Sequence, residues 1–181
     1  MSFIYVGRLD ELKGIRTLFQ AWEFLGENAP CLAVCGSGPM EDWCVRHSKG
    51  RNIRMMGYVD SSIVRKLMSE SLALILPTLL YEGFPMTIPE AFSVGTPVIC
   101  SDLGNAGSIV REGVTGWKFK AGNAAELAAA VRKCLDSDGA LRARVKEEYE
   151  SKYTPDANYR RLIEIYSEVL NANRSFGPQR R

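Results

Sequence analysis

Residues 82–99, EGFPMTIPEAFSVGTPVI, are the stretch around which the chain is organised. The apolar run 72–76 precedes it and has the length of a strand. Gly95-Thr96-Pro97 then turns the chain into a second apolar run, residues 97–100. The pattern predicts a strand, a loop, a short helix and another strand. In a parallel α/β sheet such a loop lies at the carboxyl ends of the strands, where free N–H groups at a helix start face an anion.

Two carboxylates, Glu82 and Glu90, bracket this loop. Carboxylate oxygens accept hydrogen bonds from hydroxyls, which sugars and riboses offer in pairs. Each acid also has a simpler interpretation. Thr87-Ile88-Pro89-Glu90 fits a capping box, in which Thr87 is the N-cap and Glu90 reaches back to a backbone N–H, and Glu82 fits a solvated loop acid. The spacing by itself leaves these alternatives open.

The first loop, Gly7-Arg8-Leu9-Asp10-Glu11-Leu12-Lys13-Gly14, follows an apolar run at residues 2–6. Arg8 and Lys13 stand on either side of this strand-to-helix turn. They are either solvated cations, the usual state of such residues, or a clamp on a diphosphate at the ligand-binding edge of the sheet.

A second glycine turn, Gly36-Ser37-Gly38-Pro39, follows the apolar residues 32–34. A dinucleotide fingerprint needs a third glycine at position 41, where this chain has Glu41. The sequence therefore argues against an NAD-dependent oxidoreductase.

Short apolar runs alternate with segments of helical periodicity along the chain, which predicts a Rossmann-like α/β domain. We expect three layers, α/β/α, with a mainly parallel six-stranded sheet. The predicted strands are residues 2–6, 32–34, 53–57, 72–76, 97–100 and 117–119. The predicted helices start near Ile15 and cover residues 40–47, 61–70, 86–94, 107–112, 124–135, 139–150 and 156–171, the last with an apolar stripe.

Two motifs about 70 residues apart resemble the same family. Gly7-Arg8-Leu9 with Lys13-Gly14, and Tyr81-Glu82-Gly83-Phe84-Pro85 with Glu90-Ala91-Phe92 ahead of Gly95-Thr96-Pro97-Val98-Ile99, are similar to the motifs of the family 4 (group 1) retaining GT-B glycosyltransferases. The resemblance runs from Gly7 to about Glu126. It implies the C-terminal, donor-binding half of a GT-B enzyme.

The resemblance also implies roles for individual residues. Arg8 and Lys13 would hold the donor's phosphates, Glu90 the ribose hydroxyls and Glu82 the transferred sugar. The turn at Gly36 would lie near the base, and Tyr58 and Val59 would meet it through backbone groups. Arg8, Lys13 and Glu82 are the expected catalytic residues. The expected nucleotide-sugar-binding residues are Gly7, Arg8, Lys13, Gly36, Gly57, Tyr58, Val59, Glu82, Gly83, Phe84, Pro85, Met86, Thr87 and Glu90.

The expected donor is a UDP- or GDP-sugar, and the resemblance implies no cofactor and no metal. The hexosyl group would pass to a glycan or lipid-linked acceptor held by the missing N-terminal half, so the isolated chain should be inactive. Ser108 stands where many relatives carry Glu, which leaves that carboxylate's role open. A GT-B sugar-nucleotide epimerase and a non-catalytic nucleotide-binding module remain alternatives.

Composition and length agree with one domain. The chain has 181 residues, 46% of them hydrophobic, and a net charge of +2 that gives no reason to expect nucleic acid as a partner. We expect residues 1–172 to form the domain and residues 173–181 a loose basic tail. No signal peptide or membrane span is recognisable, and five cysteines fit free thiols in a reducing cytoplasm. Peripheral association of the full-length protein with the inner face of the membrane is the alternative location.

Overall fold

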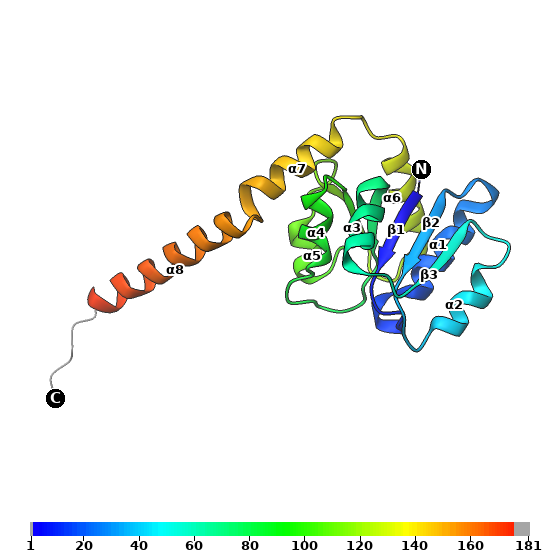
Figure 1. Cartoon of the computed structure of the whole chain (residues 1–181), viewed down its shortest axis with the longest axis horizontal. Coiled ribbons are helices and arrows are strands. Elements are labelled where there is room, and N and C mark those ends of the chain that lie inside the picture. Colours follow the sequence, from blue (N-terminus) through cyan, green and yellow to red (C-terminus); the bar gives the residue numbers. More distant parts are fainter. Residues whose placement is uncertain (1, 176–181) are drawn as a thin grey trace.

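Six strands, all parallel, form the sheet at the centre of the molecule (Figure 1). The structure is a computed structural model that describes residues 2–175, with side chains for residues 2–171. The strands are β1 (Ser2–Val6), β2 (Cys31–Cys35), β3 (Ile53–Gly57), β4 (Ser71–Leu76), β5 (Val98–Ser101) and β6 (Gly116–Phe119). The predicted α/β class and six-stranded parallel sheet are therefore confirmed.

The strands lie in the order β3-β2-β1-β4-β5-β6, so the chain runs outward from β1 on one side and from β4 on the other. Tyr5 of β1 pairs with Ile75 of β4 at this junction. A crevice forms outside the carboxyl ends of two neighbouring strands whose connections leave in opposite directions. The loops after β1 and β4 are the two that carry the motifs described above.

Helices cover both faces of the sheet. They are α1 (Ile15–Leu25), α2 (Glu41–Ser48), α3 (Ser61–Glu70), α4 (Thr87–Ser93), α5 (Gly104–Ile109), α6 (Ala124–Leu135), α7 (Leu141–Lys152) and α8 (Pro155–Ser175), with short 3-10 turns η1 (Glu11–Lys13) and η2 (Gly26–Asn28). Helix α1 packs on α6, whereas α3 packs on β1, β4 and α4. Figure 1 shows α3, α4 and α5 together on one side of the strands and α1 and α2 on the other.

The core consists of strand residues and the inward stripes of the helices. Phe3 and Ile4 of β1 are fully buried, as are Leu18 of α1 and Phe92 of α4. The ring of Phe3 meets Trp22 edge-on at 5.9 Å between centroids. Trp22 is therefore a core residue.

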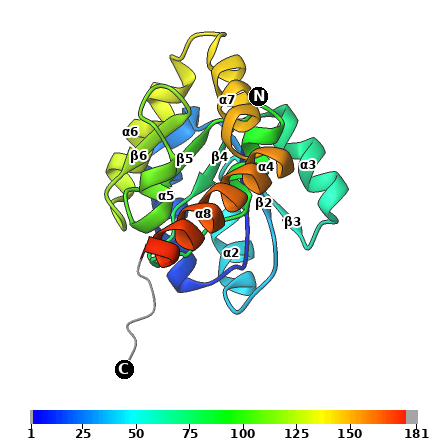
Figure 2. The ribbon, with the colours of Figure 1, turned by 90° about the vertical axis from the view of Figure 1, so that its left-hand side faces the viewer.

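Helix α8 lies apart from this core. Figure 1 shows it extending away from the sheet beyond α7, and in Figure 2 it points toward the viewer in front of the domain. Its apolar stripe is exposed to solvent and consists of Tyr159, Leu162, Ile163, Ile165, Tyr166, Val169 and Leu170. Residues 173–175, where we expected the basic tail to begin, continue this helix, and residues 176–181 lie outside the described residues.

The start of α4 corrects one prediction. Met86 stands at the N-cap in a helical conformation and the helix begins at Thr87, with no side-chain capping hydrogen bond. Thr87 is therefore already inside the helix, one residue too late to cap it, and the capping box is wrong. The helix predicted over residues 107–112 is α5, which instead covers Gly104–Ile109.

Candidate functional site

Four of the predicted side chains line one pocket at the junction of β1 and β4. The pocket has a volume of about 260 Å³. Arg8 and Lys13 reach it from the loop after β1, and Glu82 and Glu90 from the loop and helix after β4. The two loops, each of which the sequence placed at the ligand-binding edge of the sheet, therefore meet at one pocket in the structure.

Lys13 and Glu82 form an ion pair inside this pocket. Lys13 Nζ donates to Glu82 Oε1 at 2.9 Å, and the two side chains are 31% and 17% exposed. Lys13 closes the turn η1, and Gly14 follows with φ of 74°. A Cβ on Gly14 would lie 1.7 Å from the carbonyl oxygen of Pro77, so only glycine lets this loop cross the end of β4. The close crossing is what brings Lys13 beside Glu82.

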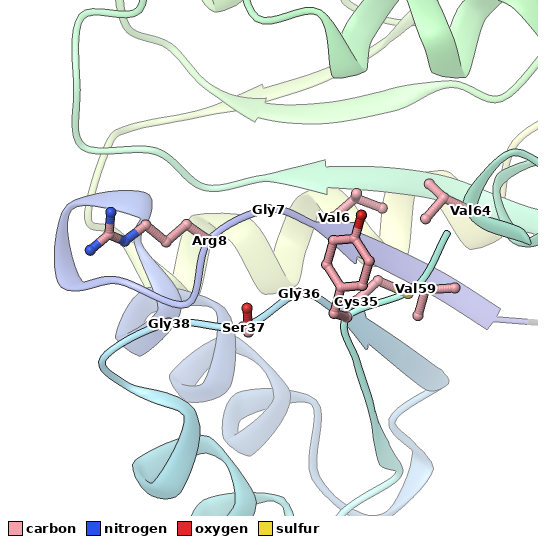
Figure 3. A pocket seen from close by; sticks show the side chains of 10 residues that line it. Val6, Gly7, Arg8, Cys35, Gly36, Ser37, Gly38, Val59 and Val64 are labelled. Atoms are coloured by element: carbon pink, nitrogen blue, oxygen red, sulfur yellow. The ribbon is translucent and has the colours of Figure 1, made fainter. Parts of the chain in front are cut away.

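Arg8 is the more exposed of the two cations. Its side chain is 69% exposed, and Arg8 Nε lies 3.7 Å from a carboxylate oxygen of Asp10. Figure 3 shows Arg8 at one end of a second pocket, with Val59 and Val64 at the other. The figure also shows its guanidinium pointing outward, away from the other labelled residues, so Arg8 is exposed and weakly held.

The second pocket has a volume of about 490 Å³ and is more apolar. It is lined by Val6, Gly7, Arg8, Cys35, Gly36, Ser37, Gly38, Tyr58, Val59 and Val64 (Figure 3). Burial raises the pKa of the Cys35 thiol to about 11, so at neutral pH the thiol stays protonated. A base-sized ring would meet apolar side chains and backbone here.

A third pocket, of about 460 Å³, continues from the second under α3. It shares Val6, Tyr58, Val59 and Val64 with the second pocket and Glu90 with the first, and it adds Ser61, Ser62, Arg65 and Met68. The three pockets therefore follow one another along the carboxyl ends of the strands. Together they give room for an extended ligand.

Hydrogen bonds between peptide groups join the loops after β1, β2 and β3. Gly7 N donates to Cys35 O at 3.0 Å, Leu9 N to Ser37 O at 2.9 Å, and Gly36 N to Gly57 O at 2.7 Å. A Cβ on Gly36 would lie 1.9 Å from the carbonyl oxygen of Gly7. Gly36 is therefore required for the close approach of two loops, whatever else it contacts.

Two predicted residues do not line these three pockets. Gly57 ends β3 and accepts the bond from Gly36, and the carbonyl of Gly83 accepts a hydrogen bond from the Asn105 amide. Every other predicted binding residue lines at least one of the pockets. Ser108 bonds back to Gly104 O within its own helix, at 3.2 Å.

Several lining residues escaped the sequence analysis. Val64 and Arg65 belong to the first turn and a half of α3, a segment that the sequence analysis predicted only as a helix. Tyr5 lies beneath Gly7 and lines the first pocket, although its place in an apolar strand indicated a core residue. Ser37 and Gly38 could have been included, since they belong to the glycine turn that contains Gly36.

Within the described residues, no group of three or more His, Cys, Asp or Glu side chains could hold a metal ion. The helices of residues 2–175 also include none that is long and apolar enough to cross a membrane.

Comparison with solved structures identifies the class of fold. Anabaena HepE, solved in complex with UDP, superposes with a TM-score of 0.80 at 19% identity, covering 92% of this chain and 48% of that one. Sucrose-phosphate synthase from Thermosynechococcus elongatus gives 0.78 at 26% identity, covering 94% and 46%. The architecture is that of GT-B glycosyltransferase neighbours.

The chain belongs to the family described as glycosyl transferases group 1, whose model matches residues 2–152. It is 31% identical over 177 residues to the glycogen synthase of Mycobacterium tuberculosis, covering 94% of this chain and 42% of that protein. It is 32% identical over 143 residues to the phosphatidyl-myo-inositol mannosyltransferase of Mycobacterium leprae, covering 76% and 38%. The chain thus spans less than half the length of these two relatives.

Proposed function

We propose that this chain binds a UDP-sugar and supplies the donor half of a retaining glycosyltransferase of family 4. The observation that carries the proposal is the pocket that two cations, Arg8 and Lys13, line together with two acids, Glu82 and Glu90. A sugar nucleotide has both the diphosphate that the cations would bind and the hydroxyls that the acids would bind.

The ligand would lie along the three pockets. Its base would occupy the apolar pocket beside Tyr58 and Val59, its ribose would reach Glu90, and its diphosphate would lie between Arg8 and Lys13. The sugar would then meet Glu82. UDP is the nucleotide we choose because HepE, which shares the fold, was solved with UDP and with UDP-glucose.

The reaction breaks the bond between the anomeric carbon and a phosphate oxygen and forms one to an acceptor oxygen. Negative charge grows on the leaving diphosphate, and Arg8 and Lys13 would stabilise it. The backbone adds few donors, because Pro85 and Pro89 lack N–H groups and the amides of Ile88 and Glu90 bond to Pro85 O and Met86 O. In the described structure the amides of Met86 and Thr87 remain for the ligand. No side chain is assigned as base, since the leaving phosphate would take the acceptor's proton.

The acceptor would be a glycan or lipid-linked sugar bound by the part of the relatives' length that this chain does not span. The chain alone would therefore bind donor without transferring it.

Calorimetry with UDP, GDP and ADP tests the proposal. UDP should bind, and Lys13→Ala should weaken it by about 1.5–3 kcal/mol, the range for a hydrogen bond to a charged group. Arg161→Ala, which removes a 64% exposed cation on α8, is the matched control and should leave the affinity unchanged. A folded chain that binds none of the three nucleotides refutes the proposal. Product analysis with a full-length protein separates transfer from epimerisation.

A further inference from the structure

The side chain of Tyr5 is a buried polar group directly beneath the candidate diphosphate site. Tyr5 is 1% exposed, and its hydroxyl donates a hydrogen bond of 2.7 Å to the carbonyl of Arg8. Its hydroxyl lies close to the turn that follows β1, since a Cβ on Gly7 would lie 3.1 Å from the Tyr5 oxygen. The phenol therefore occupies space that the absence of a side chain at Gly7 leaves open.

The residues on either side of Arg8, Gly7 and Leu9, are held by other hydrogen bonds, which do not involve Tyr5. Gly7 N donates to Cys35 O, Leu9 N donates to Ser37 O, and Leu9 O accepts from Met40 N at 3.0 Å. These bonds tie Gly7 and Leu9 to the loop after β2. The carbonyl of Arg8 accepts the Tyr5 hydroxyl instead, so the peptide group that follows Arg8 is fixed by this bond together with Leu9 N.

The Arg8 side chain has little else to direct it. It is 69% exposed, and its ion pair with Asp10 is long, 3.7 Å, so solvent competes with it. A long exposed side chain takes its direction from the backbone that carries it, and here the Tyr5 hydroxyl holds that backbone.

We propose that Tyr5 is a positioning residue for donor binding: its hydroxyl fixes the Arg8 peptide so that the guanidinium meets the diphosphate. The proposal rests on the proposed function, because it requires a diphosphate beside Arg8. Burial, with further contributions from Cys44, Glu82 and Asp10, raises the pKa of Tyr5, so the phenol keeps the proton it donates.

Tyr5→Phe removes the hydroxyl and keeps the ring. We expect it to weaken UDP binding about fivefold, the effect of one hydrogen bond, measured by calorimetry. Binding of uridine, followed by NMR titration, should be unchanged because uridine has no phosphate for Arg8 to meet.

A double-mutant cycle separates positioning from general loosening of the fold. If Tyr5 acts through Arg8, Tyr5→Phe should add less than about twofold to the loss already caused by Arg8→Ala. Ser71→Ala is the matched control, since Ser71 is 2% exposed and its hydroxyl donates to Leu67 O at 2.7 Å, at the opposite end of the sheet. It should lower the melting temperature without changing UDP affinity.

Each outcome decides the question. The inference is overturned, and the proposed function kept, if Arg8→Ala weakens UDP binding but Tyr5→Phe does not. It is also overturned if Tyr5→Phe weakens uridine equally, or carries its full penalty in the Arg8→Ala background. A wild-type chain that is folded but binds no nucleoside diphosphate overturns the proposed function and this inference together.

Discussion

The ion pair between Lys13 and Glu82 leads to an unusual expectation: replacing an acid of the site should strengthen the binding of free UDP. In the ligand-free pocket Lys13 is already bonded to Glu82 at 2.9 Å. To bind, a diphosphate has to break the bond between Lys13 and Glu82 and then lie near the Glu82 carboxylate, which is also negatively charged. Glu82→Gln keeps the shape of the side chain and removes the charge, so both penalties diminish.

The size of the effect follows from how far the pair is buried. With the two side chains 31% and 17% exposed, the pair lies between the buried and the exposed cases. Exposed pairs contribute about 0.2–1 kcal/mol, and we take the upper end of that range, about 1 kcal/mol, which corresponds to roughly fivefold tighter UDP binding.

UDP-glucose should respond in the opposite direction. Its sugar loses a hydrogen bond to a charged acceptor, which costs about 1.5–3 kcal/mol and exceeds the gain from the released Lys13. The preference for UDP-glucose over UDP should therefore fall by at least about tenfold in the Glu82→Gln variant.

Calorimetry with both ligands measures this preference. Glu164→Gln is the matched control: it removes the same charge from an acid paired with Arg161 at 3.1 Å, on α8 and away from the pockets. Its affinities should equal those of the wild type. If Glu82→Gln binds UDP more weakly than the wild type, or binds it equally, the pair does not compete with the diphosphate and the reasoning is wrong.

Three further predictions concern stability. Gly14→Ala places a Cβ against the Pro77 carbonyl at a φ of 74°, so the free energy of unfolding of the variant in urea should fall by more than about 1 kcal/mol. An unchanged free energy would contradict the close crossing of the loop over β4. Arg111→Ala removes one of the two cations that donate to Glu148, which is 6% exposed and keeps its 2.7 Å bond from Lys152, so the variant should lose about 1 kcal/mol in the same assay. No loss would mean that Lys152 suffices for this carboxylate. Burial raises the pKa of Cys100 from 9.0 to about 12, so this thiol favours the folded state below about pH 9 and that contribution is lost as the pH rises. Between about pH 8 and about pH 10, Cys100→Ala should therefore lose about 1 kcal/mol less stability than the wild type, and equal losses would contradict the shift.

The sequence predicted the sheet, and the place of both motifs at its ligand-binding edge, for one physical reason. Apolar runs of strand length separated by helical segments require parallel strands, and parallel strands place their following loops at a common edge. The four charged side chains of the pocket each follow such a strand, and they are Arg8, Lys13, Glu82 and Glu90. Their place at one edge of the sheet could therefore be expected before any interatomic distance was known. Strand β1 was predicted with the bounds that the structure shows, residues 2–6.

What the sequence could not predict depends on contacts between distant residues. The direct pairing of Lys13 with Glu82 joins residues 69 positions apart. The hydrogen bond of the Tyr5 hydroxyl could not be predicted, because Tyr5 stands in an apolar strand, where a tyrosine is usually a packing residue. The stripe on α8 indicated an amphipathic helix, but periodicity does not tell whether another surface covers it.

The hydrogen bonds that join the loops after β1, β2 and β3 run between peptide groups, and this leaves their side chains free to differ. Gly36 and Gly38 are fixed by the close approach of backbones, yet Ser37 between them enters the loop pairing through its carbonyl. Substitutions at Ser37 or Tyr58 would thus alter the wall of the apolar pocket while the loops keep their shape. Under the proposed function, selectivity for one nucleobase over another would in this way diverge among related sequences at little cost to folding.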